Sequence, residues 1–378
     1  MAKQERPLRR GWTTGTCATA AAKAAFAALI TGEFPDPVEV TLPRGERPSF
    51  TLALTRKERG SATAGVIKDA GDDPDVTHGA LVLATVRAGA PGAGVTFRAG
   101  EGVGTVTRPG LPLPPGEPAI NPVPRRMIRD AISEVAVANG CAADADVEIA
   151  IPGGEALAAK TLNARLGIVG GLSILGTTGI VVPYSCAAWI HSIHRGIDVA
   201  RAAGLTHIAG ATGATSEAAA QKLYGLPETA LIDMGDFVGG MLKYLRAHPV
   251  PRVTIAGGVG KMTKLAQGLT DLHSQRGAVD QAQLASFARA AGGSAELAAR
   301  IAAANSAAEA FALARSEGVV LGDEVARAAR ETAAGVVAGR TIAIEVAVFD
   351  RDGALVGRAP FASPEARAQA PPPRNRRR

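Results

Sequence analysis

Residues 255–268 read "IAGGVGKMTKLAQG", follow the strand-like segment "PRVT" and continue into a helical pattern. The pair Gly260-Lys261 is also found in triphosphate-binding loops. Such a loop needs a glycine five residues before Gly260 and a Ser or Thr after the lysine, but this chain has Ile255 and Met262 at these positions. A dinucleotide-binding loop needs an acidic residue at the end of the next strand, about 20 residues later, where Asp280 opens a helical pattern instead. The stretch therefore predicts a strand, a glycine turn and a helix N-terminus that suits an anion.

The sequence around this stretch alternates between short apolar runs and helical patterns. Strands are expected near 205–210, 229–233 and 252–256, and helices near 185–203, 215–224 and 236–247. Strands alternating with helices of this length predict a mostly parallel sheet with helices on both faces. Ala-rich helices are expected over 281–338, and a hairpin turned at Asp352-Gly353 closes the fold.

The earlier part of the chain mixes short strands with two helices. "VEVTLP" and "SFTLALT" flank a polar turn as in a hairpin, "ALVLATVRA" and "GVTFRAG" are typical of strands, and "RRMIRDAISEVAVANG" predicts a helix ended by Gly140. We therefore predict an α+β N-terminal domain over 1–145. An α/β domain with a mostly parallel sheet follows over 146–360, and it includes the Ala-rich helices and the C-terminal hairpin.

Most of the net charge of +6 lies at the end of the chain. Residues 364–378 hold five Arg and one Glu, so the rest of the chain is close to neutral. This composition predicts a disordered basic tail over 361–378. Because residues 364–378 have no aromatic side chain to stack on bases, the tail does not indicate nucleic-acid binding.

Cysteine usage and the apolar runs indicate a cytoplasmic protein. The three cysteines are scattered and odd in number, which is typical of a reducing compartment. Lys23 interrupts the apolar run near the N-terminus, so this run predicts a helix of the fold rather than a signal peptide. Residues 166–190 carry no charge, but glycines and Pro183 break them into elements too short to span a membrane.

The segment "TTGTCATAAAKAAFAALITG" (13–32) predicts a helix with Thr16 as its N-cap. Two interpretations stay open at its start. The hydroxyls of Thr13, Thr14 and Thr16 either cap the helix or form an anion pocket together with the free N–H groups. Cys17 has no His or Asp beside it in sequence, so it is interpreted as structural.

A second helix start carries an unusual charge pattern. Pro124 begins the helix, and Arg125, Arg126 and Arg129 follow at its positive end, where cations oppose the helix dipole. A ligand with several carboxylates would compensate for this arrangement. Alternatively, Arg126 pairs with Asp130 on the same face, and the helix is simply solvated.

The loop "VIKDAGDDPDVTHG" (66–79) is dense in carboxylates. Its spacing differs from that of a calcium-binding helix-loop-helix, and Gly-Asp-Asp-Pro is also typical of a turn. If the loop is catalytic, His78 or Asp75 is the expected proton acceptor.

Two more groups of side chains lie in the predicted α/β domain. Asp233 ends a strand beside glycine turns, where a ribose can bind, and Asp236 is expected to cap the next helix. Cys186, His191 and His194 have no fourth ligand near them in sequence, so no metal site is predicted.

Seven segments of the chain, taken as an ordered set, resemble one family. They are "LRRGWTTGTCATAAAKAA", "VIKDAGDDPDVTHGA", "GVGTVTRPGL", "AINPVPRRMI", "TLNARLGIVGGLSILGTTGIV", "GDFVGGMLKYL" and "IAGGVGKMTKLAQG". This set resembles the cobalt-precorrin-5B C1-methyltransferase family of the anaerobic route to cobalamin, from about Leu8 to the hairpin near Gly357. Trp12 departs from the family pattern, which has Tyr or Phe at that place.

The resemblance implies methyl transfer from S-adenosylmethionine to ring carbon C1 of a cobalt-containing tetrapyrrole, giving cobalt-precorrin-6A. Cobalt is then part of the substrate and not a metal bound by the protein. The carboxylates of the substrate are assigned to Thr13, Thr14, Thr16, Arg125 and Arg126. The methyl donor is assigned to Gly257, Gly258, Gly260, Lys261 and Asp233, with its carboxylate on Lys261 and the loop amides or its ribose near Asp233.

Two other classes of protein stay open. A nicotinamide-dependent oxidoreductase would use the same glycine turns, and a non-catalytic tetrapyrrole-binding protein would share the basic groove. In each case the partner is a small molecule rather than a membrane or a nucleic acid. A homo-oligomer is compatible with this sequence.

Overall fold

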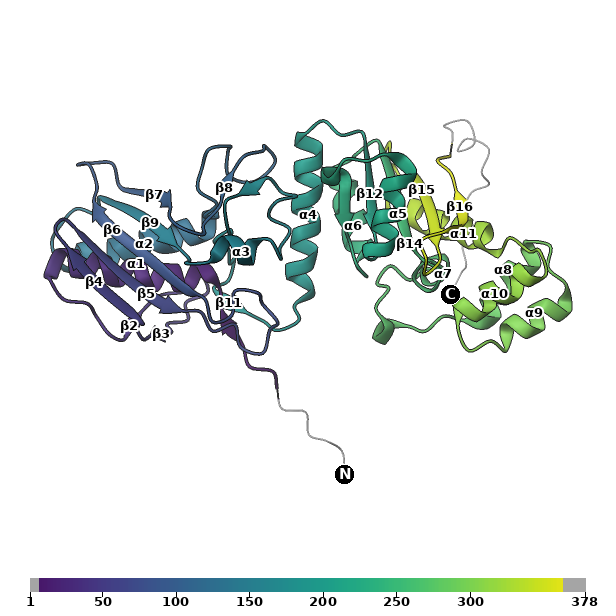
Figure 1. Ribbon diagram of the computed structural model, residues 1–378, viewed down its shortest axis with the longest axis horizontal. Helices are drawn as coiled ribbons and strands as arrows, with labels where there is room; N and C mark the ends of the chain where they lie inside the picture. Colours follow the sequence, from purple (N-terminus) through teal and green to yellow (C-terminus); the bar gives the residue numbers. More distant parts are fainter. Residues whose placement is uncertain (1–6, 363–378) are drawn as a thin grey trace, which may run out of the picture. The chain divides into compact units, whose positions relative to one another are not determined.

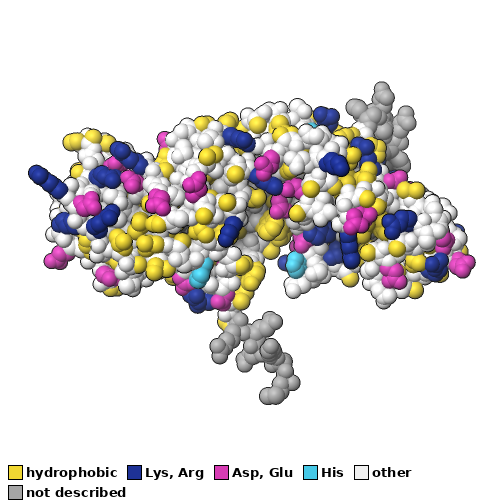
Figure 2. All heavy atoms as spheres, viewed as in Figure 1, with side chains coloured by type: hydrophobic (Ala, Val, Ile, Leu, Met, Phe, Trp, Pro, Cys, Tyr) yellow, Lys and Arg dark blue, Asp and Glu magenta, His cyan; other side chains and the backbone are white. Residues whose placement is uncertain are grey.

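The computed structural model describes residues 7–362, so the predicted basic tail lies almost entirely outside the described residues. The chain forms two compact units, Met1–Cys186 and Ala187–Arg378. On the face drawn in Figure 2, basic and acidic side chains of the described residues are interspersed on both units. This mixture fits a folded part whose charge is close to neutral.

A five-stranded sheet and two helices form most of the first unit (Figure 1). The sheet has the order β4-β5-β6-β9-β7, and only β7 and β9 run parallel to each other. Helix α1 packs on β5 and β6 and on helix α2. The strands span Leu54–Glu58 (β4), Ser61–Ile67 (β5), Leu81–Ala88 (β6), Val95–Ala99 (β7) and Ala145–Ala150 (β9), and the helices span Thr14–Thr31 (α1) and Pro122–Ala138 (α2).

Small side chains explain how closely α1 approaches the sheet. Eight of the 18 residues of this helix are alanine, and fourteen of its residues are buried. Ala62 and Ala64 of β5 and Ala84 of β6 are also buried, and they belong to the same core as the helix. Along β6, buried and partly exposed residues alternate, which is the period-two pattern of a strand with one covered face.

Short elements complete the first unit and extend it beyond the predicted boundary. The hairpin predicted for "VEVTLP" and "SFTLALT" is present, as β2 (Val38–Glu39) paired with β3 (Ser49–Phe50). Strand β1 (Gly11–Trp12) pairs with β11 (Ile180–Val181). The remaining elements are β8 (Thr105–Val106), α3 (Gly154–Ala158) and β10 (Ile168–Val169), which pairs with β8.

The predicted division at residue 145 is corrected to one after Cys186. Strand β9 begins at Ala145 and pairs with both β6 and β7, so the predicted boundary cuts a central strand of the first sheet. The local pattern of "VEIAI" is typical of a buried strand in either kind of domain, and only its partners show where it belongs.

The predicted parallel sheet is confirmed in the second unit. It has the order β13-β12-β14-β15-β16; the first four strands are parallel and β16 closes the antiparallel hairpin. The strands span His207–Ala211 (β12), Leu231–Asp233 (β13), Arg252–Gly258 (β14), Ala343–Phe349 (β15) and Leu355–Ala359 (β16). Residues 253–257 of β14 are all buried, as expected for a strand covered on both faces.

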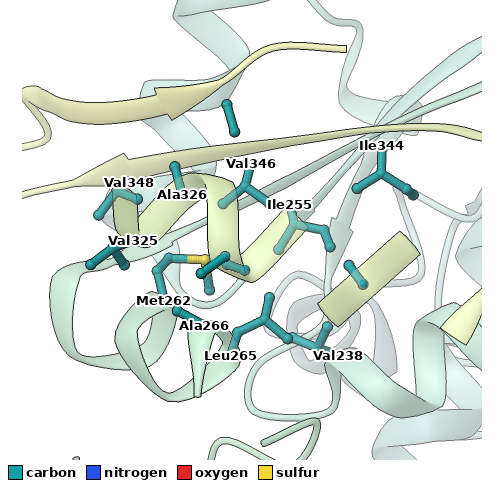
Figure 3. Packing of buried hydrophobic residues seen from close by; sticks show 14 of the residues in the cluster. Val238, Ile255, Met262, Leu265, Ala266, Val325, Ala326, Ile344, Val346 and Val348 are labelled. Atoms are coloured by element: carbon teal, nitrogen blue, oxygen red, sulfur yellow. The ribbon is translucent and has the colours of Figure 1, made fainter. Parts of the chain in front are cut away.

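Helices surround this sheet, and the predicted Ala-rich helices are present (Figure 1). Their bounds are Cys186–Ala202 (α4), Ala214–Tyr224 (α5), Val238–Ala247 (α6), Val259–Ala266 (α7), Gln281–Ala290 (α8), Ala295–Ala302 (α9), Ala307–Ser316 (α10) and Leu321–Val336 (α11), with 3₁₀ turns at Glu228–Ala230 (η1) and Ser274–Arg276 (η2). Figure 3 shows Met262 of α7 and Val325 of α11 packed beside Ile255, Val346 and Val348 of the sheet. No described helix combines the length and the apolar character that crossing a bilayer requires.

The strand order of this sheet reverses between β12 and β14. From β12 the chain runs through α5 to β13, which is the neighbour of β12 on one side. From β13 it runs through α6 to β14, which is the neighbour of β12 on the opposite side. The loops after β12 and β14 therefore diverge at the carboxyl edge of the sheet. In open parallel sheets, ligands bind at such a point of reversal.

Candidate functional site

The carboxyl ends of three neighbouring strands lie in register in the second unit. Ala211 of β12 is paired with Asp233 of β13 and with Ala256 of β14. Thr212 and Gly257, which come next along the chain, are therefore neighbours, and a side chain on Gly257 would approach the Thr212 side chain to 3.0 Å. The predicted donor residues thus come together with Thr212 at one edge of the sheet.

Three helices begin at this edge. No described side chain caps α5, α6 or α7, whose N-cap residues are Gly213, Phe237 and Gly258. The first N–H groups of a helix have no acceptor within the helix, and together with the helix dipole they attract anions. The predicted cap by Asp236 is wrong, because α6 begins at Val238 with Phe237 as its N-cap, and the Asp236 carboxylate faces Lys261 instead.

Lys261 joins the loops that follow β12, β13 and β14. Its Nζ donates a hydrogen bond to the carbonyl oxygen of Thr212 at 2.7 Å and lies 3.1 Å from Oδ1 of Asp236. That oxygen is buried and accepts no hydrogen bond from any described residue, so its contact with Lys261 is an ion pair without directed hydrogen bonding. Lys261 therefore holds the strand-end loops together, and its charge is already balanced by the protein.

Sequence reasoning missed two residues of this edge. Thr212 is buried, and its carbonyl receives the Lys261 amine; the glycine turn "AGATGAT" (209–215) was the available signal. Trp189 of α4 donates its indole N–H to the carbonyl oxygen of Asp233 at 3.2 Å. No motif marks Trp189 in the sequence, because its neighbour Asp233 lies 44 residues away.

The start of α1 in the first unit is filled by the chain itself. Thr13, and not the predicted Thr16, is the N-cap: its Oγ1 accepts a hydrogen bond from the Thr16 amide at 3.2 Å. The Thr16 hydroxyl donates to the carbonyl oxygen of Gly179 at 2.7 Å, and the Gly15 amide donates to that of Leu175 at 3.0 Å. These hydrogen bonds attach residues 175–179 to the start of α1. Because the hydroxyl and amide groups already bind the chain, the structure favours the capping interpretation over the anion pocket.

The Thr14 hydroxyl differs from its two neighbours. Thr14 is buried, but the described part of the chain contains no hydrogen bond to its hydroxyl. Cys17 in the same turn is fully buried, and burial raises the pKa of its thiol to about 12. This fits the structural role expected for Cys17.

The arginines at the start of α2 have different environments. Arg125 donates to the carbonyl oxygens of Ile120 at 2.7 Å and Pro118 at 3.0 Å, and pairs with Glu117 at 2.8 Å. Arg126 is exposed, and among residues 7–362 it forms no ion pair, not even with Asp130. Arg125 thus stabilises the preceding loop, whereas Arg126 presents its charge to solvent.

The acidic loop is held by contacts within the first unit. Lys68 is 1% exposed and its Nζ lies 2.5 Å from the Asp75 carboxylate. Burial opposes ionisation of Asp75, but the Lys68 charge and hydrogen bonds from Lys68 and Thr77 together lower the pKa of Asp75. A carboxyl with a lowered pKa is a weak proton acceptor, so this environment argues against Asp75 as a base.

The other polar groups of this loop are also engaged. His78 accepts the Ala70 amide hydrogen bond on Nδ1 at 3.1 Å, which leaves only Nε2 for other partners. The Asp69 carboxylate is bound by the Arg9 guanidinium, and these hydrogen bonds and charges lower the pKa of Asp69. The loop therefore has the contacts of a structural turn.

Cys186, His191 and His194 do not converge on a metal. Among residues 7–362, no group of three or more His, Cys, Asp or Glu side chains is arranged to hold a metal ion. The His194 ring stacks on Tyr244, with ring centres 3.9 Å apart. Both rings line a groove of about 500 Å³, which is also lined by Ile190, Phe237, Lys243 and Asp271.

Comparisons with known proteins agree with the predicted resemblance. Residues 1–183 match the family model described as CbiD, and residues 271–360 match the model described as CbiD, C-terminal domain. A protein of Bradyrhizobium sp. (strain BTAi1) named cobalt-precorrin-5B C(1)-methyltransferase is 66% identical over 98% of this chain and 98% of its own length. A protein of the same name from Agrobacterium fabrum is 67% identical over 93% of each chain.

A solved structure is also similar in sequence. It is the crystal structure of the cobalamin biosynthesis protein (cbiD) from Archaeoglobus fulgidus, which is 31% identical to this chain. The match covers 71% of this chain and 83% of that chain, with a TM-score of 0.40.

Proposed function

Because the chain belongs to the CbiD family of cobalt-precorrin-5B C(1)-methyltransferases and is a C-methyltransferase, we propose that it methylates ring carbon C1 of cobalt-precorrin-5B. S-adenosylmethionine is the proposed methyl donor and cobalt-precorrin-6A the proposed product. A cytoplasmic location is proposed as well, which the three unpaired cysteines support.

The arrangement of the second unit supports a donor site at the carboxyl edge of its sheet. The starts of α5 and α7 lack side-chain caps and lie beside the point where the strand order reverses. We assign the donor carboxylate to the amides of Gly258 and Gly260, and the ribose hydroxyls to Asp233. Gly257 lets the two loops approach each other, and Lys261 positions them rather than binding the donor directly.

The exposed arginine of the first unit supports a site for the substrate carboxylates. Arg126 lies near the start of α2, where its charge adds to the positive end of the helix dipole. We assign Arg126 and the Thr14 hydroxyl to the tetrapyrrole. Thr13, Thr16 and Arg125 hold the loops around these groups, since their polar atoms already bind the chain.

Methyl transfer needs little help from acids or bases. The electron-rich ring carbon attacks the methyl group of the sulfonium, so that a C–C bond forms while the S–C bond breaks and its electrons remain on sulfur. S-adenosylhomocysteine leaves as the second product. The protein contributes by holding the two reactants in line and by excluding water, which agrees with the structural contacts of Asp75 and His78.

Transfer of label from methyl-labelled S-adenosylmethionine to cobalt-precorrin-5B tests this function. We expect a product heavier by one labelled methyl group and a stoichiometric yield of S-adenosylhomocysteine. Tight binding of NAD(P)H without any transfer of label would instead indicate an oxidoreductase, and tetrapyrrole binding without transfer would indicate a carrier. Donor binding by chelator-treated protein should be unchanged, because position 262 is Met and carries no hydroxyl for Mg²⁺.

A further inference from the structure

We propose that Trp189 is the surface on which the purine ring of the methyl donor stacks. The inference rests on the proposed donor site and extends it to a residue that no motif of the sequence marks. Trp189 lies on α4, in the second unit, and is one of only two tryptophans in the chain.

The indole ring of Trp189 is fixed at the end of β13. Its N–H donates to the carbonyl oxygen of Asp233 at 3.2 Å. The ring lies against Gly235, which has a φ of +52°. A Cβ at this glycine would come within 3.3 Å of three indole atoms, closer than ordinary van der Waals contact. A glycine at 235 therefore leaves room for the ring to lie close to the backbone.

Trp189 remains 45% exposed although its polar atom is satisfied. Trp12 has a different environment: its ring packs edge-on against Phe50, with centres 5.5 Å apart, beside the core of the first unit. No described aromatic ring packs on Trp189. A large aromatic surface that is held in place but left uncovered is suited to a planar ligand.

The position of the ring matches the order of groups in an adenosine donor. Neighbouring strands lie about 4.8 Å apart, so β13 and β14 end about 10 Å from each other across β12. The uncapped start of α7 lies at the β14 end, Asp233 lies at the β13 end, and Trp189 adjoins Asp233 and Gly235. A carboxylate, a ribose and a purine meet these groups in the same order.

Tryptophan fluorescence tests the inference, because each single-tryptophan protein reports on one ring. S-adenosylhomocysteine serves as the probe, since it carries the purine and cannot transfer a methyl group. We expect it to quench the emission of the wild type and of Trp12→Phe, in which only Trp189 remains. Trp189→Phe, in which only Trp12 remains, should show no quenching while calorimetry still detects binding.

Calorimetry gives the size of the effect. Trp189→Ala should weaken binding of the probe by roughly ten- to a hundredfold, and Trp189→Phe should weaken it less because it keeps an aromatic face. Thermal unfolding of both variants shows whether the second unit is intact. Gly235→Ala, which displaces the ring without removing it, should weaken binding to an intermediate extent.

The outcomes separate this inference from the proposed function. If Trp189→Ala binds the probe as tightly as the wild type, the stacking inference fails and the donor site stands. If Trp189→Ala instead raises only the KM for the tetrapyrrole, the ring contacts the substrate and the inference fails. If the wild type binds neither S-adenosylmethionine nor the probe, both proposals fail together.

Discussion

The start of α1 and the starts of α5 and α7 look alike in sequence and differ in structure. Each start is rich in Gly and Thr or directly follows a strand. At α1, the Thr13 hydroxyl caps the helix and the Gly15 amide meets the Leu175 carbonyl. At the starts of α5 and α7, no described side chain takes the capping position. The start of α6 also lacks a side-chain cap, but its Gly239 amide donates to the Thr270 carbonyl oxygen at 2.8 Å. A polar helix start therefore indicates a ligand only when the chain leaves its N–H groups available.

The same contrast applies to charged groups. Lys68 and Asp75 in the first unit form a largely buried pair, and Arg125 binds two backbone carbonyls. Arg126, one residue later, remains in solvent. Substitutions in the internally paired groups should thus change stability, and substitutions in the available groups should change ligand binding.

The largest expected effect concerns Asp75. Asp75→Asn removes the partner of an almost fully buried lysine and should lower the free energy of unfolding by about 3–5 kcal/mol. Urea-induced unfolding measures this, with Asp72→Asn as a control because Asp72 is exposed. Methyl transfer per folded molecule should be unchanged. If Asp75→Asn folds normally but loses methyl transfer, this result would support the hypothesis that Asp75 is the proton acceptor.

The Asp75 pair also predicts how stability depends on pH. The folded protein lowers the pKa of Asp75, so the stabilisation is complete above the pKa of the carboxyl in the unfolded chain, about 3.9. It is lost as the pH falls through the lower folded value. Between pH 7 and pH 5 the difference in stability between wild type and Asp75→Asn should therefore stay constant. A difference that shrinks within that range would show that another group dominates.

Substitution of Lys261, in the second unit, should have the next largest effect on stability. Lys261→Met leaves the buried Asp236 oxygen without a counter-charge, which should cost about 1–3 kcal/mol in unfolding free energy. Donor affinity should fall as well, because the loops after β12 and β14 lose their link. Lys222→Met, at an exposed position of α5, is the control. Loss of donor binding at full stability would mean that Lys261 contacts the donor directly.

Arg126 and Arg125 form a matched pair on one helix. Arg126→Ala should raise the KM for the tetrapyrrole by about tenfold, the equivalent of 1.4 kcal/mol, at unchanged stability. Arg125→Ala should mainly lower stability, since it removes charge-assisted hydrogen bonds to two carbonyls. Steady-state kinetics and urea unfolding of both variants separate these effects. Wild-type kinetics for Arg126→Ala would identify it as a solvated side chain.

The smallest effect is expected at Thr13. Thr13→Ala removes an N-cap and should lower stability by about 1 kcal/mol without changing either KM. A large rise in the tetrapyrrole KM at normal stability would show that the start of α1 binds the substrate. In that case the start of α1 would bind a ligand, as is proposed for the starts of α5 and α7.

Helices and strands could be predicted from the sequence more readily than the long-range contacts that their side chains make. The parallel strands, the Ala-rich helices and the final hairpin follow from local patterns of apolar residues, glycines and caps. Three threonines in four positions do not show which one is the cap, because the Thr16 hydroxyl binds Gly179, 163 residues away. Likewise, the charge density of residues 66–79 gave no sign that Lys68 is buried, and nothing near Trp189 in sequence indicated its contact with Asp233.

Calorimetric titration of S-adenosylmethionine into Gly258→Leu tests the central claim, that the donor binds at the strand ends of the second unit. Gly258 has an ordinary backbone conformation, with φ −71° and ψ 157°, and an added Cβ there meets no atom within 4 Å. The control is Gly335→Leu, at a glycine of α11 with equally open surroundings. We predict that Gly258→Leu weakens donor binding at least tenfold, about 1.4 kcal/mol, at an unchanged unfolding midpoint, and that Gly335→Leu binds like the wild type. Equally tight binding by Gly258→Leu would contradict the claim.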